Sequence, residues 1–302
     1  MPAPSYAGQL AALGTATFWA FAALSFDAAA RRMGALSLSL IRLVIAFGFL
    51  CLTAWAMRGL PLPTDASPHA WTWLAVSGLV GFTFGDFCLF RAYVLIGPRL
   101  SLLMMALAPP LTAVIGWLLL GETLGGRDLL GMALTVGGIA WAVLERNPGD
   151  PEKGSAASRP SLSGLAMGFG GALGQAGGLV LSKLGMGSYD AVAATQVRVL
   201  AGILGYGLLF LPLHWWLRVG DALRDRRALG FAAVGAFFGP FLGVSLSLFA
   251  VRRIPAGVAA SIMALTPILI IPLVVLTRRE RVGLGGIAGA LVAVGGVALL
   301  FL

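Results

Sequence analysis

Apolar runs of helix length follow one another along this chain, separated mostly by short polar segments. Crossing a bilayer core about 30 Å thick takes about 20 apolar residues in a helix. The runs that reach this length are 7–27, 35–57, 71–93, 99–120, 127–145, 161–184, 190–213, 228–250, 257–277 and 284–302. The pattern predicts an all-α integral membrane protein with ten transmembrane helices.

One hydrophilic stretch is much longer than the others. It reads ERNPGDPEKGSAASRPS over residues 145–161 and is rich in Pro, Gly and Ser, as linkers are. Five apolar runs precede it and five follow it. We therefore expect a first five-helix repeat over 1–145, a linker loop over 146–160 and a second five-helix repeat over 161–302.

The two halves share sequence as well as helix number. A shift of 158 residues, from Pro109 to Pro267, aligns them without a gap over about sixty residues. Other pairs in this register are Gly81 with Gly239, Gly85 with Gly243, Glu122 with Glu280 and Gly131 with Gly289. Because each copy has an odd number of helices, the second copy must enter the membrane from the opposite side. Inverted repeats of this kind recur in secondary transporters, whose substrate site lies at the repeat interface.

Composition and charge narrow the class of protein further. Hydrophobic residues make up 59% of the 302 residues and charged residues only 11%, against about 25% charged in soluble domains. The net charge of +9 lies mainly in short loops, where it orients helices and meets lipid headgroups rather than nucleic acid. Cys51 and Cys88 form neither a disulfide framework nor a metal-ligand pattern, and we expect no cofactor and no metal. The first nine residues contain no Lys or Arg, so we take the first run as a retained helix.

A family resemblance rests on the stretch YVLIGPRLSLLMMALAPPLTAVIGWLLLGETLGGRDLLGMALTVGGIAWAVL, residues 93–144. This stretch resembles the repeat unit of the drug/metabolite transporter superfamily, EamA type. The features that match are the mid-span proline, the Leu-Gly-Glu turn at 120–122 and the paired glycines at 137–138. Arg42 and Arg198 match an arginine that recurs in the second helix of each half in the family.

The resemblance carries several implications for fold and function. It implies alternating access through a central cavity, formed by the first, third and fourth helices of each copy. Within the superfamily, the chain is most similar to amino-acid exporters of the YddG type, which favour aromatic and other neutral amino acids. The expected partners are therefore a small-molecule substrate and membrane lipids, with the protein functional as a monomer.

Asp86, in GFTFGDF, is the most informative single residue. An acid inside a transmembrane helix costs several kcal/mol and is a functional candidate by default. Asp86 could bind a substrate ammonium or carry a coupled proton, or it could reach headgroups or Arg91. Phe82 and Phe90 lie four residues on either side, on the same helix face, and either line a cavity or pack against lipid and helices.

Two mid-span prolines, a tryptophan and a glutamine are further candidates for the site. Prolines in mid-helix remove a hydrogen bond, and we interpret the two in the repeat as pivots beside a cavity, with a plain kink as the alternative. A mid-span tryptophan in the first run is a candidate cavity residue, and a glutamine in the run 161–184 can bind substrate or another helix. The predicted substrate-binding set is Trp19, Phe82, Asp86, Phe90, Met105, Pro109, Gln175, Ser245, Ser261 and Pro267.

Two pairs of charged residues are expected to have structural roles. Arg42 and Arg198 stay charged inside their helices, so each must snorkel, pair or satisfy backbone carbonyls. Glu122 and Glu280 follow apolar helices at short turns, and we expect them to cap or lock the start of the next helix.

Two rival functions remain to be weighed. An intramembrane aspartyl protease would use Tyr189–Asp190 with Thr83–Asp86, but the first glycine of its second motif is missing and the order is reversed, so we expect no enzyme. A carrier of cationic drugs or sugars, or a lipid-flipping subunit, is the alternative transporter.

The two indications of topology conflict. Fourteen of the Lys and Arg residues lie in the loops after odd-numbered helices against five in the other loops, which places both termini outside by the positive-inside rule. The resemblance favours termini inside, and both interpretations put the two termini on one side. The expected location is a bacterial inner membrane.

Overall fold

The computed structural model describes residues 6–144, 161–270 and 284–301, and every regular element within them is helical. The first copy contains α1 (Ala7–Met33), α2 (Ala35–Arg58), α3 (Pro68–Gly78), the π-helical segment η1 (Leu79–Gly85), α4 (Asp86–Met105), α5 (Ala108–Leu120) and α6 (Gly126–Leu144). The second contains α7 (Leu162–Met186), α8 (Ala191–Phe210), α9 (Trp216–Ala222), α10 (Arg226–Ala236), the π-helical segment η3 (Phe237–Gly243), α11 (Val244–Val251), α12 (Ala256–Met263) and α14 (Leu284–Leu300). The expected linker over 146–160 and Glu280 lie outside the described residues.

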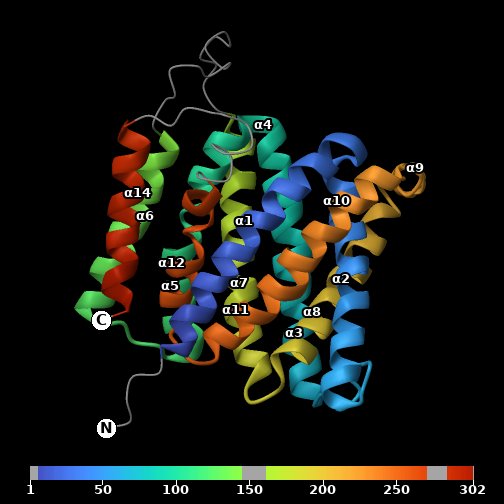
Figure 1. Ribbon diagram of the computed structural model, residues 1–302, viewed down its shortest axis with the longest axis horizontal. Coiled ribbons are helices and arrows are strands. Elements are labelled where there is room, and N and C mark those ends of the chain that lie inside the picture. Colours follow the sequence, from blue (N-terminus) through green and yellow to red (C-terminus); the bar gives the residue numbers. More distant parts are fainter. Residues whose placement is uncertain (1–5, 145–160, 271–283, 302) are drawn as a thin grey trace.

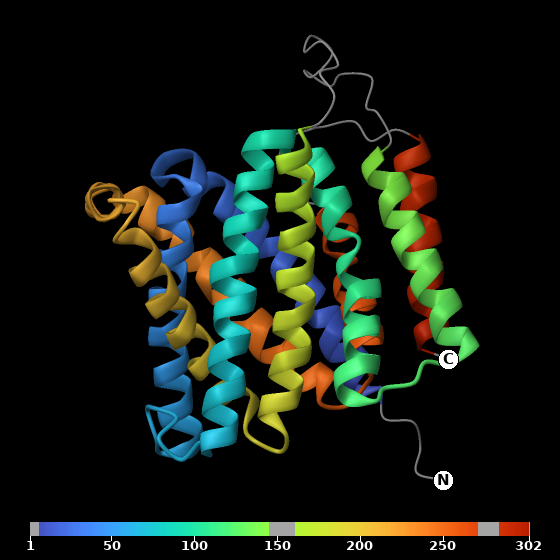
Figure 2. The ribbon, with the colours of Figure 1, turned by 180° about the vertical axis from the view of Figure 1, so that it is seen from behind.

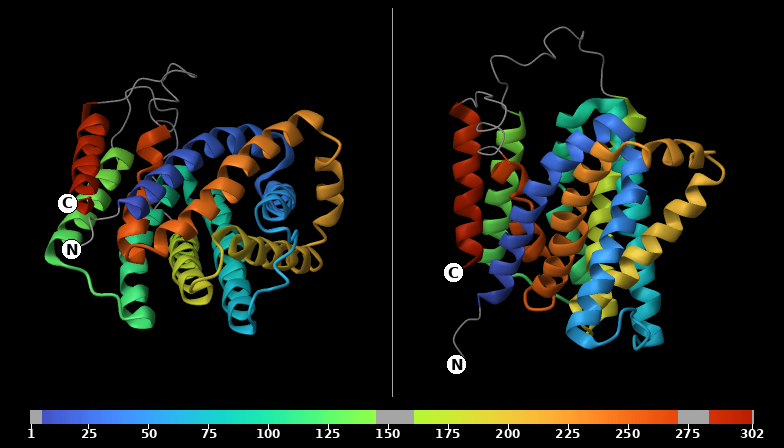
Figure 3. Two further views of the ribbon diagram at one scale, coloured as in Figure 1. Left: turned by 60° about the horizontal axis from the view of Figure 1, so that its bottom comes forward. Right: turned by 45° about the vertical axis from the view of Figure 1, so that its right-hand side comes forward.

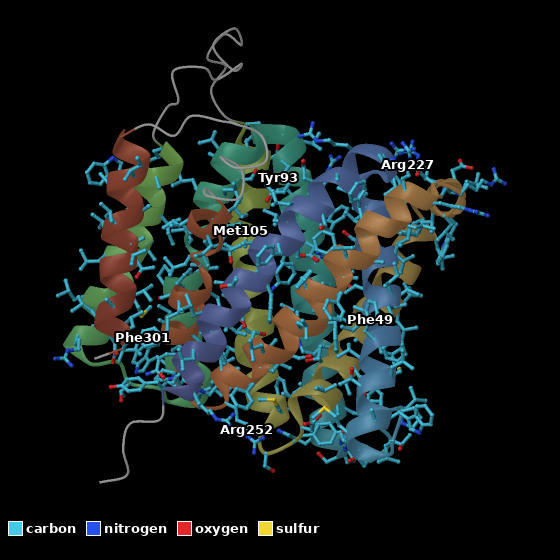
Figure 4. All side chains as sticks on the ribbon, in the orientation of Figure 1. Phe49, Tyr93, Met105, Arg227, Arg252 and Phe301 are labelled. Atoms are coloured by element: carbon cyan, nitrogen blue, oxygen red, sulfur yellow. The ribbon has the colours of Figure 1, made fainter. Side chains whose placement is uncertain are left out.

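Seven of the described helices are long and apolar enough to cross a membrane, so the chain is an integral membrane protein. Two of these spans are composite, because α3, η1 and α4 run on as Pro68–Gly97, and α10, η3 and α11 run on as Arg226–Val251. Arg227 and Arg252 mark the opposite ends of the second composite span (Figure 4). Ten crossings remain a prediction, since the expected run 257–277 is described only as far as Ile270.

Local sequence signals account for where the helices begin and end. Ser67 caps α3 by accepting a hydrogen bond from Ala70 N, and Pro68 occupies the first turn. Asp190 caps α8 through Val192 N and Ala193 N, both at 3.0 Å. Asp225 caps α10 in the same way, and the backbone N–H of Ala228 and the Arg32 guanidinium hold the pKa of Asp225 below its usual value.

The helices that correspond in the two copies run antiparallel, as inverted repeats require. At one end of the α2–α8 pair, Trp215 Nε1 donates to Ser37 Oγ at 3.1 Å. At the other end, Gln196 Nε2 donates to the carbonyl of Pro61 at 2.8 Å. α6 and α14 lie side by side at one edge of the bundle and also run in opposite directions (Figure 1).

Glycines bring α6 and α14 into backbone contact. A Cβ added at Gly138 would clash with the backbone of Ala293, and one added at Gly289 would lie 2.6 Å from Ala142 N. Small residues at these positions allow the close approach by which membrane helices associate. Of the paired glycines found in the sequence, Gly138 therefore lies where the two copies meet, whereas a Cβ added at Gly137 would meet nothing within 4 Å.

Both ends of the described chain lie on one face of the bundle, which we call the terminal face. The rings of Tyr6 and Phe301 stack there with centroids 6.4 Å apart, and Figure 1 shows the start of α1 and the end of α14 at the same end of the bundle. The two ends of the described chain therefore share a side. At the opposite face, the short helix α9 runs along the surface of the bundle (Figure 3, right).

Candidate functional site

Two π-helical segments interrupt equivalent spans at the same position of the repeat. η1 begins at Leu79 and η3 at Phe237, and 237 − 79 = 158 is the offset of the sequence repeat. π-helical turns are rare and are frequently found at functional sites. In the sequence they are visible only as the aligned pairs Gly81–Gly85 and Gly239–Gly243, which do not by themselves indicate a π-helix.

A glycine-rich helix packs directly on η1. A Cβ added at Gly174 of α7 would lie 2.5 Å from the Cα of Gly85, and one added at Gly178 would lie 2.8 Å from the Cα of Gly81. α7 therefore contacts η1 backbone to backbone, and Figure 2 shows it running alongside α3 and α4. That contact explains the high glycine content of α7, because small residues allow membrane helices to approach closely.

The second copy repeats this arrangement with larger side chains. α1 takes the place of α7 and packs on η3, where a Cβ added at Gly239 would lie 3.2 Å from Ala22 Cβ. A Cβ added at Gly243 would lie 2.9 Å from Trp19 Nε1. Earlier in the two copies the repeat has a slightly different offset: Arg42 and Arg198, in the second helix of each copy, are 156 residues apart. The same offset makes Trp19 the counterpart of Gln175.

Asp86 lies at the start of α4, directly after η1, and is 5% exposed. It forms a buried ion pair with Arg42 of α2, and Gln175 Nε2 of α7 donates to its second oxygen at 3.0 Å. The Arg42 guanidinium also lies over the ring of Phe26, 5.2 Å from the centroid. The interpretation that Asp86 reaches Arg91 or the headgroups is wrong, because Asp86 is buried and pairs with an arginine 44 residues earlier.

Arg198, the counterpart of Arg42, has different surroundings. It is 5% exposed, its Nε is buried without a hydrogen-bond partner, and it forms no ion pair or hydrogen bond with the described residues. Its guanidinium lies over the ring of Phe82, 5.1 Å from the centroid. A Cβ added at Gly81 would lie 3.5 Å from Nη2 of Arg198. The two arginines therefore share a position in the repeat but not a partner.

Both predicted pivot prolines stand at helix breaks rather than inside continuous helices. α4 ends at Met105 and α5 begins at Ala108, with Pro109 in its first turn, where the missing N–H costs little. In the second copy, α12 ends at Met263 and helical turns resume over 266–270, which include Pro267. Each proline therefore begins a half-helix at the same point of the repeat, and the expectation of mid-helix proline is corrected.

The remaining predicted residues are dispersed along the composite spans and the half-helices. Phe90 is half-buried and its ring lies 6.2 Å from that of Tyr93. Ser261 is buried and donates to the carbonyl of Gly257 at 2.9 Å, whereas the hydroxyl of Ser245 is enclosed without a partner among the described residues. Met105, labelled in Figure 4, is half-buried at the end of α4. Of the predicted set, the structure joins Asp86 and Gln175 by a hydrogen bond, and the substrate contacts stay predictions.

Glu122 links the two copies at the terminal face. It accepts a hydrogen bond from Ala256 N at 2.8 Å and pairs with Lys183 Nζ at 2.5 Å. Lys183 also donates to the carbonyl of Ile254 at 2.7 Å. The expectation that Glu122 caps the next helix is wrong, because it caps α12 of the other copy. The next helix, α6, has Asp128 in its first turn, which accepts from Gly125 N.

Acidic side chains elsewhere in the structure are engaged in capping or ion pairs. Asp190, the second acid of the protease hypothesis, caps α8, while Asp86 pairs with Arg42. Within residues 6–144, 161–270 and 284–301, no group of three His, Cys, Asp or Glu side chains is placed to hold a metal ion.

Comparison with known proteins places this arrangement among membrane carriers. The EamA-like transporter family matches residues 6–144 and again residues 162–302, one match for each copy. An uncharacterized protein of Pseudomonas aeruginosa, PA1977, is 29% identical over 178 residues, which cover 59% of this chain and 56% of that protein. The matched region thus spans little more than half of that relative. A protein of known crystal structure shares the fold with a TM-score of 0.74 at 19% identity, over 97% of this chain and 95% of the other.

Proposed function

This chain belongs to the EamA-like transporter family, and from that premise we propose that it exports neutral and aromatic amino acids by alternating access. Membrane transport within the drug/metabolite superfamily follows from the family itself, whose members are transporters rather than enzymes. The substrate class and the route are our proposal. We further propose that the protein works as a monomer in a bacterial inner membrane.

One observation carries the proposed route: both copies are irregular at the same places. η1 and η3 coincide in the repeat, as do the breaks before Pro109 and Pro267. Broken helices in a membrane are tolerated where protein or a water-lined cavity satisfies the freed backbone groups. In inverted-repeat transporters such breaks flank the substrate site at the midplane. We therefore assign the route to the seam between the two copies, lined by η1, η3 and the half-helices.

The proposed substrate class follows from the chemistry of that seam. Among the described residues, the buried charges there are Arg42 with Asp86, and Arg198, whose guanidinium lies over Phe82. A single cationic group among aromatic and small residues suits a zwitterion with an apolar side chain. A sugar would require several more hydrogen-bonding side chains, and a cationic drug would meet an unpaired arginine.

Alternating access requires contacts that break on one face while they form on the other. The Glu122–Lys183–Ala256 contacts join α5, α7 and α12 at the terminal face. We propose that these contacts separate when the seam opens toward that face. Asp86 is engaged by both Arg42 and Gln175, which favours facilitated diffusion over proton exchange at this residue.

Transport by the purified protein in liposomes tests the proposed substrate class. We expect labelled phenylalanine and tryptophan to enter protein-containing liposomes faster than empty ones, and we expect labelled glucose and ethidium to enter both at equal rates. An imposed pH gradient is expected to leave the initial amino-acid flux unchanged. Retained phenylalanine and tryptophan alongside moving glucose or ethidium would end the amino-acid assignment. A flux that follows the pH gradient would instead refute uncoupled transport.

A further inference from the structure

A buried arginine without a counter-charge distinguishes the second copy from the first. Arg198 is 5% exposed and has neither an ion pair nor a hydrogen-bond partner among the described residues. Its guanidinium stays charged at physiological pH, and an uncompensated charge inside a bilayer is costly. A bound anion would supply the missing charge and the missing hydrogen-bond acceptors.

The first copy shows what such a partner looks like. There Arg42 pairs with the carboxylate of Asp86, which comes from the neighbouring composite span. In the repeat, Asp86 corresponds to Val244 (244 − 86 = 158), which is buried in the same apolar cluster as Phe82, the ring under Arg198. The second copy therefore keeps the arginine of the pair and lacks its acid.

The residue that donates a hydrogen bond to the Asp86 carboxylate also differs between the two copies. Gln175 donates to Asp86 in the first copy, and its counterpart in the second copy is Trp19, which is half-buried against Gly243. Val244 and Trp19 thus replace an acid and an amide with apolar surface. Arg198 is therefore a cation among aromatic and aliphatic side chains. Gly81 has no side chain, so the space beside Nη2 of Arg198 is left free of one.

We propose that Arg198 binds the carboxylate of the transported substrate, in place of the acid that the second copy lacks. This inference rests on the proposed function, because it assigns to the substrate of that function a carboxylate joined to an apolar side chain. Arginine binds a carboxylate through two parallel N–H donors, which gives directional recognition as well as charge. Arg42 has its acid within the protein and is not available for this role.

Competition against labelled phenylalanine uptake in liposomes tests the assignment. The probes are phenylalanine, phenylalaninamide, which lacks the carboxylate, and 3-phenylpropionate, which lacks the ammonium. For the wild-type protein we expect phenylalaninamide to compete about tenfold or more weakly than phenylalanine, since charged hydrogen bonds are lost. We expect 3-phenylpropionate to compete, because it keeps the carboxylate.

Variants at both members of the incomplete pair sharpen the test. Arg198→Gln is expected to abolish the discrimination between phenylalanine and phenylalaninamide, and Arg198→Lys to restore part of it. Val244→Asp supplies the acid found in the first copy, so it should neutralise Arg198 and remove the discrimination with the arginine still present. Size-exclusion profiles and melting temperatures identify the variants that fold, and only those are compared with the wild type for competition by phenylalanine and phenylalaninamide.

The outcomes separate the two proposals. If phenylalanine is carried and folded Arg198→Gln or folded Val244→Asp discriminates as the wild type does, the carboxylate site is refuted and the amino-acid function stands. If no amino acid is carried but labelled 3-phenylpropionate enters in an Arg198-dependent manner, the amino-acid function fails and the carboxylate site stands.

Discussion

Replacing Asp86 with alanine is expected to lower the free energy of unfolding by about 3–5 kcal/mol, the cost of leaving one member of a buried ion pair uncompensated. Arg42 is 5% exposed, so its guanidinium cannot recover its hydration without moving. Gln175 would lose the acceptor for its side chain at the same time. Unfolding in mixed micelles by dodecyl sulfate, followed through tryptophan fluorescence, measures this change.

Two further variants identify the partner of Asp86. Arg91→Ala is expected to change stability little, because Arg91 is exposed and Asp86 pairs with Arg42 instead. The double variant Arg42→Met/Asp86→Leu should recover most of the loss, since apolar pairs often replace buried ion pairs at no net cost. A double variant no more stable than Asp86→Ala, or a large loss with Arg91→Ala, would contradict the described pairing.

Replacing Gly174 with alanine is expected to destabilise the protein by about 1–3 kcal/mol, the range typical of overpacked positions. The added Cβ would lie 2.5 Å from the Cα of Gly85, so the backbones of α7 and η1 would have to separate. That separation would also move Gln175 away from Asp86, and we expect transport to fall together with stability. The same micellar unfolding and the phenylalanine uptake assay measure the two effects.

Gly177→Ala is the matched control on the same helix. A Cβ at Gly177 meets only Val80 Cγ1, at 3.4 Å, which is ordinary van der Waals contact. Since alanine favours a helix over glycine by about 0.5–1 kcal/mol, this variant should be as stable as the wild type or more so. Equal losses from both substitutions would show that the backbone contact between α7 and η1 is not what limits the spacing.

The repeat was the part of this fold that sequence could predict most fully. Residues such as Pro109 and Pro267 share a register because the two copies fold alike, and a single offset then aligns the π segments and the helix breaks. Antiparallel counterparts followed from an odd number of helices per copy, and the contacts between α2 and α8 agree with that. The π-helical geometry itself could not be predicted, because glycine at two aligned positions is compatible with an ordinary α-helix.

Side-chain partners across the bundle were harder to predict. Periodicity places residues on a helix face, but it does not say which helix lies opposite, so Arg91 was the nearest candidate for Asp86 along the chain. Glu122 was assigned to the adjacent helix for the same reason, and it caps α12, 134 residues away. The repeat could have indicated Arg42 as the partner, because Arg42 and Asp86 belong to the same copy, and the position that matches Asp86 in the other copy is Val244.

Exchange of labelled phenylalanine across liposomes tests most directly whether solute crosses by alternating access at the seam. Liposomes containing the purified protein are loaded with unlabelled phenylalanine or with buffer, and the initial uptake of label is compared. The account predicts faster uptake into the loaded liposomes, because the internal substrate returns the binding site to the outer face. Uptake that is equal with and without internal phenylalanine, or no uptake above empty liposomes, would contradict it.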